Sequence, residues 1–171
     1  MKEENNPAFS YRPIGIIHSP YQDPAGMPIQ PQGARGVQGR VEIYEEYRPG
    51  LSDLEGFSRI FLIYSFHRSA GYGLVVIPFL DARPRGVFST RAPRRPNAIG
   101  LSIVRLERVK DGELVIADVD ILDGTPLFDI KPYVPAFDAY PDERSGWLSG
   151  CDEKVAEARS DRRFLDKTLD S

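Results

Sequence analysis

SIVRLERVKDGELVIADVDIL, residues 102 to 122, is the stretch of sequence that decides the predicted fold. From Ser102 to Lys110 apolar and polar residues largely alternate, and this spacing predicts a strand with one buried face. Asp111-Gly112 follows, a pair that tolerates the positive φ angles of a two-residue hairpin turn. Residues 113–122 then predict the returning strand. The sequence therefore predicts an antiparallel β-hairpin here.

Further strands are predicted before the hairpin, where short β-rich runs are bounded by Gly and Pro. They cover residues 11–19, 38–44, 58–66 and 73–79. Ser52 and Glu55 have the spacing of a capping box, which predicts a short helix over residues 51–57. Residues 20–39 hold several Pro and Gly without a period and should form an irregular loop. Short strands linked by turns predict a mainly β fold, a small barrel-like β domain or a sandwich, with short helices.

The chain has 171 residues and is 41% apolar, which suits one globular domain with its own core. We expect a disordered lead over residues 1–9 and the globular domain over residues 10–145. Residues 146–171 should form a tail, because apolar residues within 152–169 have partly helical spacing. The sequence thus predicts a C-terminal helical tail on a β domain.

Several classes of protein are disfavoured by simple patterns. Cys151 is the only cysteine, so no disulfide can form within the chain, and its position favours a packing or surface role over a nucleophile. The first residues lack the apolar stretch of a secretory signal, and no apolar run approaches the roughly 20 residues that span a bilayer. We therefore expect a cytoplasmic protein without a membrane role.

Common cofactor fingerprints do not fit either. Gly71-Tyr72-Gly73 lacks a third glycine and precedes a strand, whereas a dinucleotide loop follows a strand and opens a helix. The sequence contains no phosphate-binding GxxxxGK[ST] loop. His18, His67 and Cys151 lack the spacing of paired metal ligands, so no metal is expected.

Charge is uneven along the chain although the net charge is only −3. Residues 82–106 contain six arginines and neither Asp nor Glu, whereas residues 111–143 carry nine acidic residues against the single cation Lys131. A basic face of this kind could steer a phosphate backbone. A solvated surface, or ion pairs within the chain, is the alternative.

GVFSTRAPRRPNAIGLS, residues 86 to 102, is one of two segments in which Pro, Gly and charged residues replace apolar periodicity. Arg91, Arg94 and Arg95 lie beside Pro93 and Pro96, whose rings fix φ and stiffen the loop. Guanidinium groups held in this way match a carboxylate or a phosphate through paired hydrogen bonds. They could equally pair with acidic neighbours.

DGTPLFDIKPYVPAFD, residues 123 to 138, is the second such segment, and its first four residues predict a tight turn. Asp129, Lys131 and Tyr133 then alternate along an extended stretch, so their side chains can share one face. A carboxylate, an ammonium group and a phenol on one face suit acid–base chemistry or substrate orientation. The alternative is a surface ion pair beside a packed tyrosine.

The order and the amino-acid sequences of these two segments resemble those of the TsaA-like family. Its members are the TrmO-type tRNA methyltransferases, which use S-adenosylmethionine without a Rossmann fold. The resemblance covers most of the expected globular domain. It implies a β-barrel-like catalytic domain, usually a homodimer, that methylates N6 of threonylcarbamoyladenosine beside the tRNA anticodon. The family's cofactor contacts fall on Pro28, Ile29, Gln30, His67, Arg68, Arg91, Leu101, Asp123, Gly124, Thr125 and Pro126.

The resemblance also gives charged residues candidate roles. Asp129 is the candidate base for the acceptor nitrogen, with Lys131 and Tyr133 binding or orienting the acceptor. Ile29 stands where many relatives carry arginine, which leaves its backbone as the expected contact. Two other functions stay open: a non-catalytic module that binds S-adenosylmethionine or RNA, and a methyltransferase with a different small acceptor. The expected contacts to tRNA phosphates are Arg83, Arg85, Arg94 and Arg95.

Overall fold

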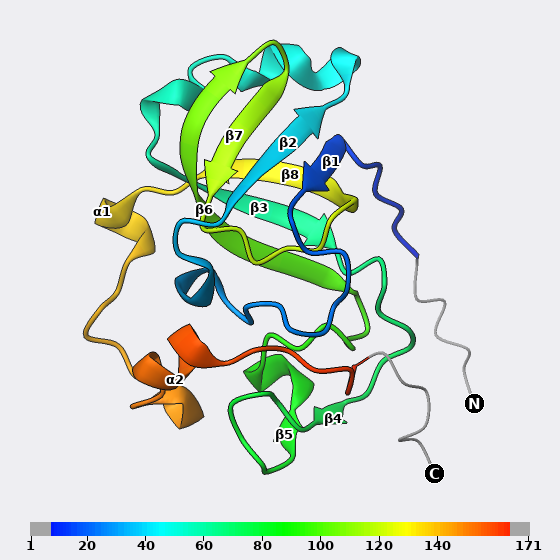
Figure 1. Cartoon of the computed structure of the whole chain (residues 1–171), viewed down its shortest axis with the longest axis vertical. Helices are drawn as coiled ribbons and strands as arrows, with labels where there is room; N and C mark the ends of the chain where they lie inside the picture. The colour runs from blue at the N-terminus through cyan, green and yellow to red at the C-terminus, as the bar shows by residue number, and fades with distance from the viewer. Residues whose placement is uncertain (1–7, 165–171) are drawn as a thin grey trace.

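The computed structural model describes residues 8–164, and antiparallel strands in this range close into a six-stranded barrel (Figure 1). The order around the barrel is β1-β2-β7-β6-β3-β8. The predicted mainly β, barrel-like fold is thus confirmed, and the sandwich is excluded. The barrel strands are β1 (Gly15–His18), β2 (Gln38–Ile43), β3 (Arg59–Ser65), β6 (Ile99–Lys110), β7 (Glu113–Ala117) and β8 (Thr125–Pro132).

The remaining described elements are short. β4 (Val75–Val76) and β5 (Arg85–Gly86) pair with each other outside the barrel. The α-helices are α1 (Pro135–Asp138) and α2 (Asp152–Glu157). Short 3₁₀ helices occupy Pro31–Ala34, Glu45–Leu51, Leu54–Gly56, Val87–Ser89 and Gly146–Leu148.

The predicted hairpin is β6 and β7, joined at Asp111-Gly112 with φ angles of 52° and 83°. Both angles are positive, as a tight two-residue turn requires, so the turn prediction is confirmed. The second strand ends at Ala117 rather than at Leu122 as predicted. Asp118 stops it with a φ of 65°, and its carboxylate accepts bonds from the Gly36 amide and the Arg59 guanidinium instead.

Two local predictions were wrong. The apolar run 73–79 forms a strand only at Val75–Val76, which pairs with β5 outside the barrel and leaves Leu74, Val75 and Ile77 exposed. The expected helix over 51–57 is replaced by 3₁₀ turns. Ser52 does not cap a helix; its hydroxyl donates to Asp53, whose φ of 65° breaks the backbone path there.

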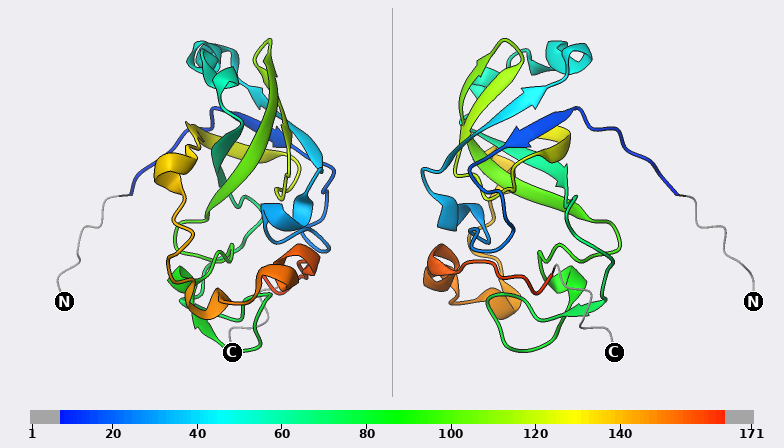
Figure 2. Two further views of the ribbon diagram at one scale, coloured as in Figure 1. Left: turned by 90° about the vertical axis from the view of Figure 1, so that its left-hand side faces the viewer. Right: turned by 45° about the vertical axis from the view of Figure 1, so that its right-hand side comes forward.

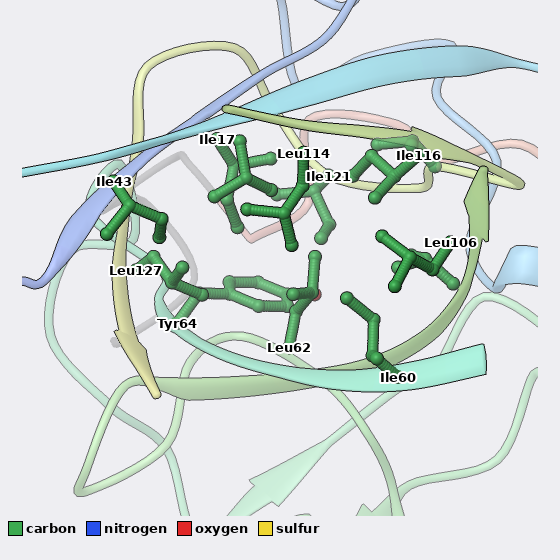
Figure 3. Close-up of a cluster of buried hydrophobic side chains, with 13 residues drawn as sticks. Ile17, Ile43, Ile60, Leu62, Tyr64, Leu106, Leu114, Ile116, Ile121 and Leu127 are labelled. Carbon is green, nitrogen blue, oxygen red and sulfur yellow. The ribbon is translucent and has the colours of Figure 1, made fainter. Parts of the chain in front are cut away.

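Interior-facing residues of every barrel strand fill the barrel with apolar side chains (Figure 3). Ile17, Leu62 and Leu127 among them are fully enclosed. At one end of the barrel the Tyr64 ring lies across Gly100 of β6, where a Cβ would collide with the ring. Glycine at this position therefore lets a phenol close the barrel end that faces the loops.

Below that end, the loop 20–37, the β4–β5 region and the tail lie together (Figures 1 and 2). Of the helix predicted over 152–169, α2 forms only its first part, and residues 165–169 lie outside the described range. Beyond α2 the chain is extended because Ser160 exchanges backbone hydrogen bonds with Gly26 and Met27. Phe164 then packs on Phe79, so the tail is joined to both neighbouring segments.

Candidate functional site

A cavity of about 1160 Å³ lies between the Tyr64 end of the barrel and these loops. Segments far apart in sequence contribute to its wall. They are the loop 24–32, the end of β3 with residues 66–69, residues 78–80, the arginine-rich loop 88–101, residues 120–125 and the tail between Ser145 and Phe164. The cavity is therefore a product of long-range packing.

Most of the residues expected to contact a cofactor line this one cavity. They are Pro28, Ile29, Gln30, His67, Arg68, Arg91, Leu101 and Thr125. Arg91 donates from Nη1 to Gln30 Oε1 at 2.7 Å, which joins the arginine-rich loop to the long irregular loop. The two Pro-braced segments thus meet, since Arg91 comes from the first and Thr125 from the second.

Asp123, Gly124 and Pro126 do not line the cavity. Asp123 accepts a 3.1 Å bond from the Ser19 amide and lies 3.5 Å from His18 Nδ1. Burial alone would raise the pKa of this carboxyl, but bonds from Ser19 and Gln22 outweigh burial and lower it. Asp123 is therefore an ionised anchor that ties the turn to β1 and places Thr125 beside His67.

His67 and Thr125 form a polar corner of the cavity. Thr125 Oγ1 lies 3.4 Å from His67 Nδ1 and donates to the Leu122 carbonyl at 2.7 Å. Desolvation by burial is the main reason why the pKa of His67 is lowered. At neutral pH the imidazole is therefore uncharged and acts through hydrogen bonds.

Sequence reasoning missed a polar network at the barrel end. Ser102 Oγ donates to Asp120 Oδ1 at 2.7 Å and lies 3.1 Å from the Tyr64 hydroxyl. Burial raises the pKa of Asp120 to about 6 and the pKa of Tyr64 as well. The available signal was a carboxylate inside an apolar run, VDIL at 119–122, where a core strand would carry none.

Asp129, Lys131 and Tyr133 do not line this cavity but lie on the outer side of the barrel. Asp129 pairs with Lys131 at 2.9 Å, and the Tyr133 ring packs edge-on against Phe61. In the strand register Leu101 of β6 is paired with Ile63 of the neighbouring strand β3. Ile63 is in turn paired with Asp129 of β8, on the other side of β3. Strand spacing thus puts Asp129 about 10 Å from Leu101, beside the cavity rather than inside it.

The arginines expected to contact phosphates differ in their surroundings. Arg85 donates to Asp81 at 2.6 Å and stacks over Trp147 at 5.4 Å, and Arg95 donates to the Thr90 and Ala92 carbonyls. Arg94 is buried at 9% exposure, so the expectation that it meets a phosphate at the surface does not hold. Arg85 thus forms an ion pair within the chain, as the alternative has it, whereas Arg95 bonds backbone carbonyls and Arg83 is left exposed.

Within residues 8–164, the helices lack the length and the apolar content that spanning a membrane requires. Within the same residues, His, Cys, Asp and Glu form no cluster of three that could hold a metal ion.

Comparison with known proteins places the chain in a family. Residues 16–139 match the tRNA-methyltransferase O N-terminal domain. A probable S-adenosyl-L-methionine-binding protein of Pyrococcus abyssi is 54% identical over 155 residues, which cover 91% of this chain and 84% of that protein. The tRNA (adenine(37)-N6)-methyltransferase of Mus musculus is 37% identical over 74% of this chain and 31% of its own length.

A solved structure agrees with the sequence matches. TrmO from Pseudomonas aeruginosa superposes with a TM-score of 0.72 at 38% identity, over 85% of this chain and 64% of that one. The chain thus spans less than two thirds of the TrmO chain that it matches. The matched domain covers most of the barrel and of the loops that form the cavity. On these grounds the chain belongs to the tRNA-methyltransferase O family.

Proposed function

We propose that the protein is a tRNA methyltransferase that transfers the methyl group of S-adenosylmethionine to N6 of threonylcarbamoyladenosine beside the anticodon. The observation that carries the proposal is the meeting of Gln30, His67, Arg91, Leu101 and Thr125 around one cavity. Relatives named for S-adenosylmethionine binding and for tRNA (adenine(37)-N6) methylation support the same donor and acceptor.

The cavity fits S-adenosylmethionine in chemistry and size. The Arg91 guanidinium, held by Gln30, suits the methionine carboxylate, and Ile29 with Leu101 offers apolar surface for the adenine. A volume of about 1160 Å³ exceeds the roughly 300–1,000 Å³ of typical small-molecule sites. Space for part of an acceptor nucleoside therefore remains beside the donor.

Bound S-adenosylmethionine would supply an activated methyl group, so the protein's main task is to orient the acceptor nitrogen. We assign the acceptor side to the outer face of β6, β3 and β8, which adjoins the cavity at Leu101. Lys131 would attract the carboxylate of the threonyl group, and Tyr133 would orient the base. Asp129 is the proposed base that takes the N6 proton.

Asp129→Asn tests this assignment. The substitution keeps the size of the side chain but removes the proton acceptor, so single-turnover methylation should fall by about 10²-fold. Affinity for S-adenosylmethionine should stay unchanged because Asp129 does not line the cavity. Rapid-quench assays with threonylcarbamoyladenosine-containing tRNA provide the measurement, and an unchanged rate would remove Asp129 from the mechanism.

We also propose a homodimer in the cytoplasm. Leu74, Val75, Ile77 and Phe88 are 46% to 76% exposed and gather around β4, next to the cavity. Contiguous exposed apolar side chains of this kind mark an interaction surface. Val75→Asp should shift the protein towards monomer in sedimentation velocity, whereas Phe137→Asp on α1, at a similarly exposed aromatic, should not. A monomeric wild-type protein would contradict the proposal.

The decisive experiment is mass spectrometry of nucleosides from tRNA incubated with the protein and S-adenosylmethionine. One added methyl group on threonylcarbamoyladenosine is the expected product. Transfer to the free nucleoside in place of tRNA would indicate a small-molecule acceptor. Donor binding without transfer to either would favour a non-catalytic binding module.

A further inference from the structure

Asp120 contributes a carboxylate to the cavity wall that none of the donor contacts above uses. It lies between β7 and β8 and lines the cavity with Tyr64, Leu101 and Thr125. Its Oδ1 accepts the 2.7 Å bond from Ser102. Among residues 8–164 no Lys, Arg or His side chain forms an ion pair with it, although Arg91 exerts a longer-range attraction.

Hydrogen bonds from the barrel end hold the Asp120 carboxylate in one orientation. Ser102 and Tyr64 are 1% and 5% exposed, and both point into the end of the barrel. The single hydroxyl proton of Ser102 goes to Asp120, so the Tyr64 hydroxyl donates to Ser102 Oγ. Tyr64 can reach Ser102 because residue 100 is glycine. Asp120 also accepts a bond from its own backbone amide, and together these bonds fix its carboxylate at the cavity wall.

Asp120 differs in its ionic surroundings from the other charged residues that line the cavity. Arg68, Arg91 and Arg95 line the cavity as cations. The other lining carboxylate in the described range, Asp161, is held by Arg163 through bonds of 2.6 to 2.9 Å. Asp120 is thus the lining carboxylate without a cation beside it. Enclosing an anion in this way costs free energy unless a positive group joins it.

We propose that Asp120 recognises the positively charged sulfur of S-adenosylmethionine, and that Ser102 and Tyr64 position its carboxylate. The assignment rests on the proposed function, because it concerns the same donor site. S-adenosylhomocysteine, the product, shares the carboxylate, ammonium and adenosine groups of the donor but has a neutral sulfur. A carboxylate facing the sulfur therefore distinguishes donor from product, which helps the product to leave.

Calorimetric titration of both compounds into the wild-type protein and Asp120→Asn tests the assignment. Asparagine keeps the shape and the bond from Ser102 but removes the negative charge. Affinity for S-adenosylmethionine should fall about tenfold, while affinity for S-adenosylhomocysteine should change less than twofold. Asp161→Asn is the matched control, since it neutralises the other lining carboxylate and should leave the ratio of the two affinities unchanged.

Each other outcome contradicts the assignment. An equal loss for both compounds would mean that Asp120 holds the ammonium or a ribose hydroxyl, which they share. Unchanged affinities would leave Asp120 without a ligand role. A wild-type protein that binds neither compound would overturn the proposed function itself, and this assignment with it.

The positioning role of Ser102 has a separate readout. Ser102→Ala removes the bond that orients the carboxylate but keeps its charge, so the ratio of the two affinities should fall about threefold. Tyr64→Phe, which removes only the hydroxyl, should lower the same ratio by a smaller factor. Variants that lower both affinities together, with the ratio intact, would show a merely structural role for this network.

Discussion

At the scale of single residues, Arg91 and Asp120 place opposite charges on one cavity wall. Arg91 could be anticipated from the sequence, because two prolines and several arginines in a short loop indicate a stiff cationic segment. Asp120 could not, because its chemistry depends on burial against Ser102 and Tyr64, which belong to different strands. Burial of a titratable group is a property of the packed structure.

Because Asp120 is buried, we also expect the stability of the ligand-free protein to depend on pH. Its pKa of about 6, raised above the ordinary value of 3.8 by burial, means that ionised Asp120 destabilises the fold above pH 6. The penalty, on the order of 1–3 kcal/mol, shrinks as the pH falls from 6 to 4, where Asp120 becomes protonated in the folded state.

Asp120→Asn should therefore have a higher Tm than the wild-type protein at pH 7.5 and the same Tm near pH 4. Differential scanning calorimetry from pH 4 to 8 measures the difference. Charged or titratable neighbours that also line the cavity, among them Arg91, His67 and Tyr64, remain in both proteins, so their titration largely cancels. A difference in Tm that does not vary with pH would contradict the assigned pKa.

At the scale of elements, the hairpin of β6 and β7 was predictable because its signals are local. Alternation and Asp-Gly act within a few residues of each other. The prediction of a full strand over 73–79 was wrong because apolar composition does not show whether a segment joins the barrel, and here Leu74, Val75 and Ile77 stay exposed outside it. The capping-box pattern at 51–57 failed for a related reason, since Asp53 takes a left-handed conformation that interrupts a helix.

Gly100 links the β6 strand to the site. Gly100→Ala should destabilise the protein by about 1–3 kcal/mol, because its Cβ would overlap the Tyr64 ring in a close-packed barrel end. Urea denaturation followed by fluorescence measures the change. Gly86→Ala is the control: no atom lies within 4 Å of its added Cβ and its φ is −58°, so stability should change by less than about 0.5 kcal/mol. Equal stability of both variants would contradict the steric argument.

At the scale of the whole molecule, the tail holds the long loop that forms one side of the cavity. Ser160 Oγ donates to the Pro24 carbonyl at 2.5 Å and accepts from the Met27 amide at 3.0 Å. Trp147 donates to the Ser89 carbonyl, which ties the same tail to the arginine-rich loop. The tail therefore couples the two loops that carry Gln30 and Arg91.

Ser160→Ala should loosen the loop over residues 24–30. Losing two hydrogen bonds costs about 1–2 kcal/mol, so amide exchange in that loop should accelerate by roughly 5- to 30-fold. Affinity for S-adenosylmethionine should fall as well. Hydrogen–deuterium exchange mass spectrometry measures the first effect. Ser149→Ala, at an exposed tail serine, should leave the loop unchanged, and equal exchange in both variants would refute the coupling.

The sequence by itself determined the β-rich fold and the hairpin, and its resemblance to a family supplied the loop residues that we propose as donor contacts. Alternation, turn chemistry and family motifs are all encoded in consecutive residues. Only the tertiary structure decided that Asp120 joins the cavity, that Asp129 lies outside it and that Arg85 is paired with Asp81. These outcomes depend on strand register and on the packing of distant loops, and a side chain's charge, burial and partners are settled only when those segments meet.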